Sequence, residues 1–250
     1  KRIYLSCFFM LLFSFIATAQ TPVAHYPFNG NANDAIGTLN GTVSGAILST
    51  DRFGNASSAF RFDGADDNID LSNSNIIRPT AALTISAWFN LENPAGAIAG
   101  RQILSCTENA GYQIAYDRIL NAFVLYVRRN GGYGFVQVAA APYLTGWHFM
   151  AGTFDGRFTR LYMDGVLVGT DDAGATFSVQ YFSGVKTYIG AEASDPIATG
   201  VPIDLNYYWQ GRIDEVKIYA TALTAAQVQQ EFTANVGPVA HYPFNGNAND

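Results

Sequence analysis

The sequence predicts an all-β protein built as a two-sheet antiparallel sandwich. Apolar and aromatic residues alternate with polar ones in short runs, which is the period of strands that turn one face to a core. Glycine, asparagine and aspartate separate these runs, and 24 glycines among 250 residues are a rich supply of turn formers. Charged residues make up only 14% of a chain long enough for one large β domain. Short strands at this spacing are typical of a sandwich.

Five strands and one hairpin follow from this pattern in chain order. The predicted strands cover residues 83–89, 112–116, 122–127, 135–139 and 147–154. Residues 161–168 then predict a β-hairpin, because Asp164-Gly165 between two apolar runs fits the positive φ angles of a two-residue type I′ turn.

One short C-terminal helix is predicted after the last strand. Thr224 with Gln227 forms a capping box, and residues 225–232 follow without glycine or proline. The rest of the domain is expected to be sheet and loop.

The first nineteen residues are typical of a secretory signal peptide. Lys1 and Arg2 precede an apolar run over residues 3–16, and Ala17-Thr18-Ala19 fits the small-residue cleavage pattern. A membrane anchor is the alternative, but the run is shorter than the ~20 residues that cross a bilayer. We therefore expect cleavage before Gln20, a secreted chain at the cell surface or outside it, and no membrane insertion after cleavage.

Charge and cysteine content argue against a nucleic-acid-binding protein and against a disulfide-bonded one. The net charge is −6 and no run of lysine or arginine is present, which argues against a nucleic-acid partner. Cys106 is the one cysteine outside the signal segment, so no disulfide is expected within the chain. It follows an apolar stretch and is predicted to be a small buried hydrophobic residue.

A thirteen-residue sequence occurs twice. Residues 22–34 and residues 238–250 both read PVAHYPFNGNAND, at an offset of 216. An offset of this size indicates duplication of a whole domain, since solenoid repeats are only 20 to 50 residues long. We expect one domain over residues 22–236, and residues 238–250 as the start of a second, truncated repeat. Neighbouring repeats of the same chain are then expected partners.

Six sequence blocks resemble the laminin-G-like, or concanavalin A-like, jelly roll domain of exported proteins. They are residues 25–34, 62–69, 83–89, 146–149, 161–165 and 211–219, in the order of the family. The resemblance implies two antiparallel sheets packed face to face, with the first and last strands adjacent. It is more distantly similar to pentraxins and to retaining glucanases.

The residues do not favour an enzyme. A retaining glycosidase needs two carboxylates about 5 to 5.5 Å apart, and glucanases of this fold place them in a Glu-x-Asp-x-x-Glu motif on one strand. No such motif is present, and the five glutamates are scattered. His25 and His148 are the two histidines of the domain, and both are expected to be structural. No catalytic residue is predicted.

Calcium is the cofactor that the oxygen-rich turns suggest. Residues 29–34 and the aspartates around Asp63 offer the carboxylate and amide oxygens that calcium prefers. The resemblance implies a structural site at Asp214, with Asp63 or Asp34 and nearby main-chain oxygens. The alternative is that these clusters only form turns.

Two loop-edge regions are candidates for ligand binding. Residues 190–195 resemble the pentraxin calcium-binding stretch, which points to Glu192 and Asp195, with Glu108 and Asn109 as the partner loop; a solvated acidic loop is the alternative. Aromatic platforms for a sugar are expected at Tyr133 and Tyr207, which we predict to be more exposed than Trp209.

The expected function is a secreted, non-catalytic binding module for carbohydrate or an extracellular protein, assisted by calcium and repeated in tandem. Repetition favours binding, because linked weak modules gain avidity. The alternatives are a structural spacer of an adhesin and an accessory domain of a larger extracellular carbohydrate-active enzyme. A glycosidase of the same fold ranks third.

Overall fold

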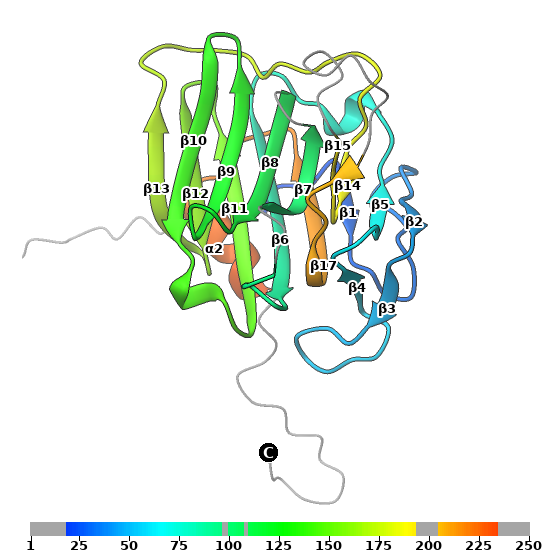
Figure 1. Cartoon of the computed structure of the whole chain (residues 1–250). Helices are drawn as coiled ribbons and strands as arrows, with labels where there is room; N and C mark the ends of the chain where they lie inside the picture. Colours follow the sequence, from blue (N-terminus) through cyan, green and yellow to red (C-terminus); the bar gives the residue numbers. More distant parts are fainter. Residues whose placement is uncertain (1–18, 97–99, 108–109, 194–204, 235–250) are drawn as a thin grey trace, which may run out of the picture.

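The computed structural model describes residues 19–96, 100–107, 110–193 and 205–234. In these ranges the chain forms two large antiparallel sheets that pack face to face (Figure 1). The fold is therefore the predicted jelly roll sandwich with one short C-terminal helix. Residues 1–18, which are nearly all of the predicted signal segment 1–19, lie outside the described residues. The repeat segment 238–250 lies outside them too.

The larger sheet has eight strands among the described residues, and the first and last strands of the domain lie side by side in it. Its order is β13 (Val166–Asp172), β12 (Phe158–Met163), β11 (Trp147–Phe154), β6 (Leu83–Leu91), β17 (Gln210–Tyr219), β4 (Ala59–Asp63) and β3 (Ile47–Ser49). The eighth strand, β1 (Ala24–Tyr26), pairs with β17 beyond the end of β4. This confirms the adjacency that the resemblance implies.

The second sheet has seven strands in the described part of the chain. Its order is β10 (Gly132–Ala139), β9 (Ala122–Arg129), β8 (Ala110–Asp117), β7 (Gly100–Thr107), β14 (Tyr188–Ile189), β5 (Asn68–Asp70) and β2 (Thr42–Ser44). A small ladder of β15 (Glu192–Ala193) and β16 (Leu205–Asn206) lies beside it, and 3₁₀ turns cover Asn75–Ile77 and Ala141–Tyr143. All five predicted strands are present, as β6, β8, β9, β10 and β11.

The predicted turn and cap have the expected chemistry. Asp164 and Gly165 join β12 to β13 with φ angles of 49° and 78°, both positive as a type I′ turn requires. Helix α2 (Ala225–Ala234) begins after Thr224, whose Oγ1 accepts the N–H of Gln227 at 3.3 Å. In return the Gln227 Oε1 accepts the N–H of Thr224 at 2.9 Å, which completes the capping box.

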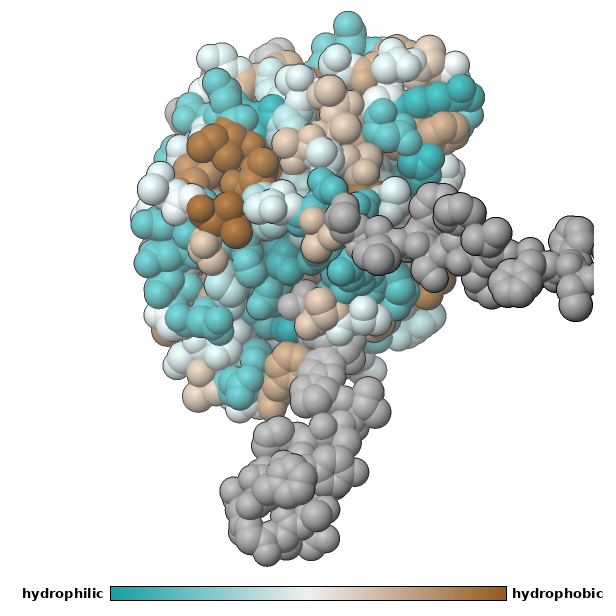
Figure 2. All heavy atoms as spheres, turned by 180° about the vertical axis from the view of Figure 1, so that it is seen from behind, coloured by the Kyte–Doolittle hydropathy of each residue, from teal (hydrophilic) through white to brown (hydrophobic). Residues whose placement is uncertain are grey.

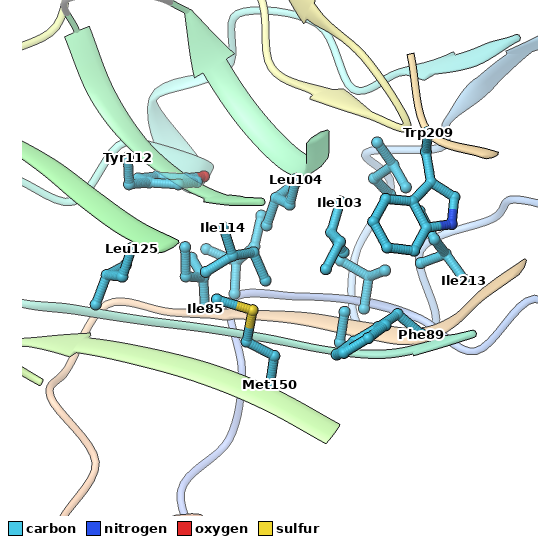
Figure 3. Packing of buried hydrophobic residues seen from close by; sticks show 14 of the residues in the cluster. Ile85, Phe89, Ile103, Leu104, Tyr112, Ile114, Leu125, Met150, Trp209 and Ile213 are labelled. Atoms are coloured by element: carbon cyan, nitrogen blue, oxygen red, sulfur yellow. The ribbon is translucent and has the colours of Figure 1, made fainter. Parts of the chain in front are cut away.

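The core lies between the two sheets and follows from the alternation along each strand. Figure 3 shows Ile85, Phe89 and Met150 of the larger sheet facing Ile114 and Leu125 of the smaller one. The Phe89 ring lies 4.7 Å from that of Phe123, across the layer. Trp209 is fully buried, as predicted. Burying each large side chain contributes roughly 1.5 to 3 kcal/mol, so this layer supplies most of the stability.

Cys106 and the two histidines have structural surroundings. Cys106 is buried in the core, where burial raises the pKa of its thiol. The Nε2 of His25 lies 2.7 Å from Glu215, and the Nδ1 of His148 lies 2.8 Å from Asp164. The second ring nitrogen of His148 lies 2.9 Å from the carbonyl oxygen of Thr145. These contacts agree with the predicted structural roles.

The outer face of the larger sheet is covered. Helix α2 packs there through Val228 and Phe232 against Trp88 and Phe149, and it lies behind the strands in Figure 1. The guanidinium of Arg52, from the β3–β4 loop, lies 4.7 Å from the Trp88 ring centre. From this side the surface is mostly hydrophilic, with one small hydrophobic patch (Figure 2). No helix in the described part is long and apolar enough to cross a membrane.

Candidate functional site

The outer face of the smaller sheet carries a pocket. Alternate residues of β8 and β9, such as Ile114 and Leu125, point into the core, so their neighbours Ala115 and Val124 point outward. No helix of the described residues covers them, and a pocket of about 360 Å³ opens over β7 to β10. This volume falls in the range of small-molecule sites.

The floor of the pocket is low because its residues are small. Ala110, Gly111, Ala115 and Val124 line it. Gly111 cannot be larger: its φ is +63°, and a Cβ there would lie 2.7 Å from the Cβ and Sγ of buried Cys106. The small residues let larger side chains at the margin stand above the floor.

One wall is aromatic and comes from β9 and β10. The Tyr126 ring stacks on Phe135 with 4.6 Å between centres and meets the edge of Tyr133 at 6.1 Å. Tyr133 is 37% exposed and lies under the guanidinium of Arg128, 4.8 Å from its ring centre. This wall offers flat apolar surface beside hydrogen-bond donors, which is the chemistry that a sugar ring contacts.

The opposite wall is Tyr207, which directly follows β16. Its φ is +50°, a conformation that costs a residue other than glycine about 1 to 3 kcal/mol. The carbonyl of Tyr207 accepts the N–H of Gln102 at 2.9 Å, and its ring packs over Gly100. The strained backbone is therefore held by β7, and the Tyr207 side chain is preorganised at the pocket.

Polar groups complete the pocket between these walls. Glu192, only 2% exposed on β15, accepts a hydrogen bond from the Nε2 of Gln102 at 2.8 Å. The Oε1 of Gln102 is buried at the pocket and has no hydrogen-bond partner among the described residues. Burial raises the pKa of Tyr126, and the charges of Asp117 and Glu192 add to the rise, so the Tyr126 hydroxyl stays a donor at neutral pH.

Three of the four predicted ligand-binding residues meet in this pocket. Tyr133, Tyr207 and Glu192 all line it. Asp195 lies outside the described residues, as do Glu108 and Asn109. Glu192 itself is buried and bonded rather than part of a solvated loop. Sequence reasoning missed Gln102 and Tyr126, whose only signal was their outward position in the alternation, whereas Arg128 belongs to the polar turn before Tyr133 that the sequence offers as a loop-edge candidate.

The three predicted metal ligands are spread along β17 and do not converge. Asp63 lies opposite Gln210, Asp214 lies four residues further on, and Asp34 bonds to the N–H of His25, which lies opposite Lys217. Seven strand residues separate the two ends of this row, roughly 23 Å. The predicted site joins Asp214 with Asp63 or Asp34. Asp63 lies four strand residues from Asp214 along β17, roughly 13 Å, so one ion does not bind that pair.

The surroundings of Asp214 do not fit calcium. The guanidinium of Arg52 is ion-paired with the Oδ2 of Asp214. The other oxygen, Oδ1, has no hydrogen-bond partner among the described residues, but a cation there would lie beside the positive charge of Arg52. Burial raises the pKa of Asp214 and the charge of Arg52 opposes that rise. Asp34 in turn accepts the N–H groups of His25 and Ile36. These two aspartates have protein partners that explain their positions.

Asp63 belongs to a cluster with Asp66 and Asp67. Carboxylate oxygens of the three lie within 4.8 Å of one another. Burial raises the pKa of Asp67, and the charges of Asp63 and Asp66 add to the rise. The oxygen donors suit a hard cation. They also cap their own turn, because Asp63 accepts the N–H of Ala65 at 2.8 Å and Asp67 that of Asp63 at 2.8 Å.

Several solved structures of binding domains share the architecture of this chain. The receptor binding domain of a botulinum neurotoxin mosaic serotype C/D matches with a TM-score of 0.63 at 14% identity, over 86% of this chain and 51% of that one. The serotype D ligand binding domain in complex with N-acetylneuraminic acid matches with a TM-score of 0.62 at 15% identity, over 86% and 51%.

A third solved structure is the binding domain of botulinum neurotoxin DC in complex with rat synaptotagmin II. It matches with a TM-score of 0.57 at 16% identity, over 85% of this chain and 51% of that one. The chain thus spans about half the length of these structures, and at such identity the likeness concerns the fold. No curated protein sequence matches the chain.

A family model identifies the chain by sequence. The laminin G model, described as the concanavalin A-like lectin/glucanases superfamily, matches residues 63–229. That range runs from the end of β4 into helix α2 and includes all strands around the pocket. The chain therefore belongs to the concanavalin A-like lectin/glucanases superfamily, as a domain of the laminin G type.

Proposed function

We propose that this chain is a secreted, non-catalytic binding module that holds an extended glycan in the pocket over β7 to β10. The observation that carries the proposal is the meeting of Tyr133, Tyr207 and Glu192, far apart in sequence, around one pocket. Solved structures of the same fold include complexes with N-acetylneuraminic acid and with synaptotagmin, which supports a glycan or an extracellular protein as the ligand class.

The shape of the pocket favours a short oligosaccharide over a single ring. The pocket follows β8 from Gly111, beside Arg128, to Asp117, opposite Ala122. Six residues of strand span roughly 20 Å. Aromatic surface at Tyr133 lies near the Gly111 end, and the amides of Gln113 and Gln102 lie further along the strand, so successive sugar units would meet both kinds of contact.

Binding is tested by titration calorimetry of oligosaccharide fractions against residues 20–250. We expect Tyr133→Ala and Tyr207→Ala each to weaken binding five- to tenfold, since a lost aromatic contact is worth about 1 kcal/mol. Phe53→Ala is the matched control, because Phe53 is an aromatic side chain, 48% exposed, that does not line the pocket. Equal affinities for all three variants would overturn the glycan proposal.

The absence of catalysis is a separate part of the proposal. Two carboxylates, Asp117 and Glu192, line the pocket, but each is already an acceptor, from the N–H of Leu120 and the amide of Gln102. We expect bound oligosaccharide to be recovered intact after prolonged incubation. Release of reducing ends that Glu192→Gln abolishes would show a glycosidase instead.

The second candidate function is a structural spacer within a repeated surface protein. The repeated segment 238–250 favours it, because domains repeated in tandem lengthen a protein without any need to bind a ligand. A spacer would show no affinity for glycans and no loss of function in the Tyr133 and Tyr207 variants, so the same titrations separate the two functions.

A further inference from the structure

The first strand of the domain lies in residues 22–34, and the side chains of this short segment anchor it to the sheet. In residues 22–34, Ala24, Tyr26 and Phe28 are completely buried. The backbone of β1 pairs with β17, where Ala24 faces Ile218 and Tyr26 faces Val216. The Tyr26 hydroxyl donates to the carbonyl of Leu39 at 2.8 Å.

Further contacts of this segment lie within it or reach the body of the domain. The Phe28 ring meets the Phe60 ring edge-on at 5.0 Å, and the N–H of Gly30 donates to the carbonyl of Ser57 at 2.8 Å. Inside the segment, Asp34 accepts the N–H of His25 at 3.1 Å and so closes the turn.

Residues 238–250 repeat all of these side chains. Ala240, His241, Tyr242, Phe244 and Asp250 stand where Ala24, His25, Tyr26, Phe28 and Asp34 stand in the first copy. Because the two segments are identical, each has the same side chains and backbone donors to offer to β17, to Phe60 and to Leu39. The contacts themselves therefore give no preference for one copy over the other.

The second copy is also tethered close to the place that the first copy fills. Helix α2 is anchored beside β1, since Glu231 bonds to the Nζ of Lys217 at 2.8 Å and Lys217 is the partner of His25. The helix ends at Ala234, seven residues before His241. Seven extended residues reach roughly 23 Å, so the linker allows His241 to arrive opposite Lys217 of the same domain.

We propose that residues 238–250 are an interchangeable first strand, which docks on β17 of the preceding domain in place of residues 22–34. The occupant is the segment of the same chain, because a short tether gives it an effective concentration in the millimolar range, which a second molecule does not have. The groove on β17 holds only one copy at a time, so residues 22–34 leave it when residues 238–250 dock there.

Melting of the full chain tests the exchange with matched variants. Tyr26→Ala with Phe28→Ala damages the first copy, Tyr242→Ala with Phe244→Ala damages the second, and a fourfold variant damages both. We expect either double variant to melt within a few degrees of wild type, and the fourfold variant about 10 °C lower or more, as loss of buried aromatic side chains predicts. A first-copy variant that melts as low as the fourfold variant would overturn the proposal.

Disulfide trapping shows which segment occupies the groove. Partner residues of an antiparallel ladder are close enough for a disulfide, so Lys217→Cys is combined with either His25→Cys or His241→Cys. Both pairs lose the same lysine, which makes the first the control for the second. We expect both to form the bond within one chain. A 217–241 bond that fails to form, or forms only between chains, contradicts exchange within the chain.

Discussion

At the scale of single residues, the molecule uses paired charges to fix its loops. Arg52 crosses from the β3–β4 loop to Asp214 on the last strand, where both side chains are nearly buried. Asp164 supplies the positive φ of the β12–β13 turn, accepts the N–H of Phe149 at 2.8 Å and bonds to His148. Single substitutions at these positions therefore change the stability of contacts between distant segments.

The His148–Asp164 pair predicts a pH dependence of stability. The hydrogen bond that His148 donates to Asp164 raises the pKa of His148 above its ordinary 6.5, and partial burial opposes the rise. Between 6.5 and the higher folded-state pKa, the folded chain binds more protons than the unfolded one, so this contribution is complete below pH 6.5 and is lost as the pH rises. Urea unfolding of wild type and His148→Gln should differ most at pH 5.5 and least at pH 9.

Asp164→Asn is the companion variant, because it keeps the turn and the acceptor for Phe149 but removes the charge. It should flatten the pH profile as His148→Gln does. A profile that stays unchanged in both variants would mean that another group controls stability in this range.

Calcium stays a prediction, and the Asp63, Asp66 and Asp67 turn is where it is tested. Calcium at 100 times its dissociation constant would stabilise the fold by about 2.7 kcal/mol, a rise in the melting midpoint of about 5 to 11 °C over a chelated sample. Asp66→Asn should remove most of that rise. Asp214→Asn is the contrasting variant, because its carboxylate is paired with Arg52. Equal midpoints with calcium and with chelator would leave the cluster as a turn former.

At the scale of elements, the outer faces of the two sheets differ: one is covered by the helix and the other carries the pocket. Helix α2 covers the outer face of the larger sheet, where its Phe232 stacks on Trp88 with 5.5 Å between ring centres. In the part of the chain that the structure describes, no helix covers the outer face of the smaller sheet over β8 and β9, and a pocket lies there. Within the described ranges, the position of the ten-residue helix α2 thus decides which face of the sandwich stays open.

The capping box of α2 predicts a graded loss of stability. Thr224→Ala removes the Oγ1 that accepts the N–H of Gln227, and we expect the free energy of unfolding to fall by about 1 kcal/mol. Thr224→Ser keeps the acceptor and should stay close to wild type in the same urea titration. An equal loss in both variants would assign the effect to the methyl group instead.

At the scale of the whole molecule, the pocket and the pairing of the first strand lie on different sheets. The pocket is built by β7 to β10, with Tyr207 and Glu192 at its margin, whereas β1 pairs with β17 of the larger sheet. The two proposals can therefore fail independently.

Chemical-shift mapping checks that division. Addition of an oligosaccharide that binds should shift amide resonances in β7 to β10 and around Glu192 and Tyr207, and should leave those of α2 and β17 in place. Shifts concentrated at α2 or at the Asp63 turn would place the ligand elsewhere.

Several features of this fold are local and could be predicted from the sequence. Strand positions follow from two-residue alternation, the β12–β13 hairpin from Asp164-Gly165, and the α2 cap from Thr224 and Gln227, because each depends on residues a few positions apart. The family resemblance added the adjacency of first and last strands. It also pointed to Glu192, while aromatic residues at loop edges pointed to Tyr133 and Tyr207.

The tertiary structure alone decided which of these residues meet. Glu192 contacts Gln102, and Tyr207 contacts β7, through pairing between segments about ninety or more residues apart. Asp214 forms an ion pair with Arg52, 162 residues away in the chain. Such contacts depend on the register of the sheets and on which loop folds over which face. The sequence by itself therefore determined the sandwich and the residue types suited to binding, whereas long-range packing decided that Tyr133, Tyr207 and Glu192 form one pocket and that Asp34, Asp63 and Asp214 do not form one metal site.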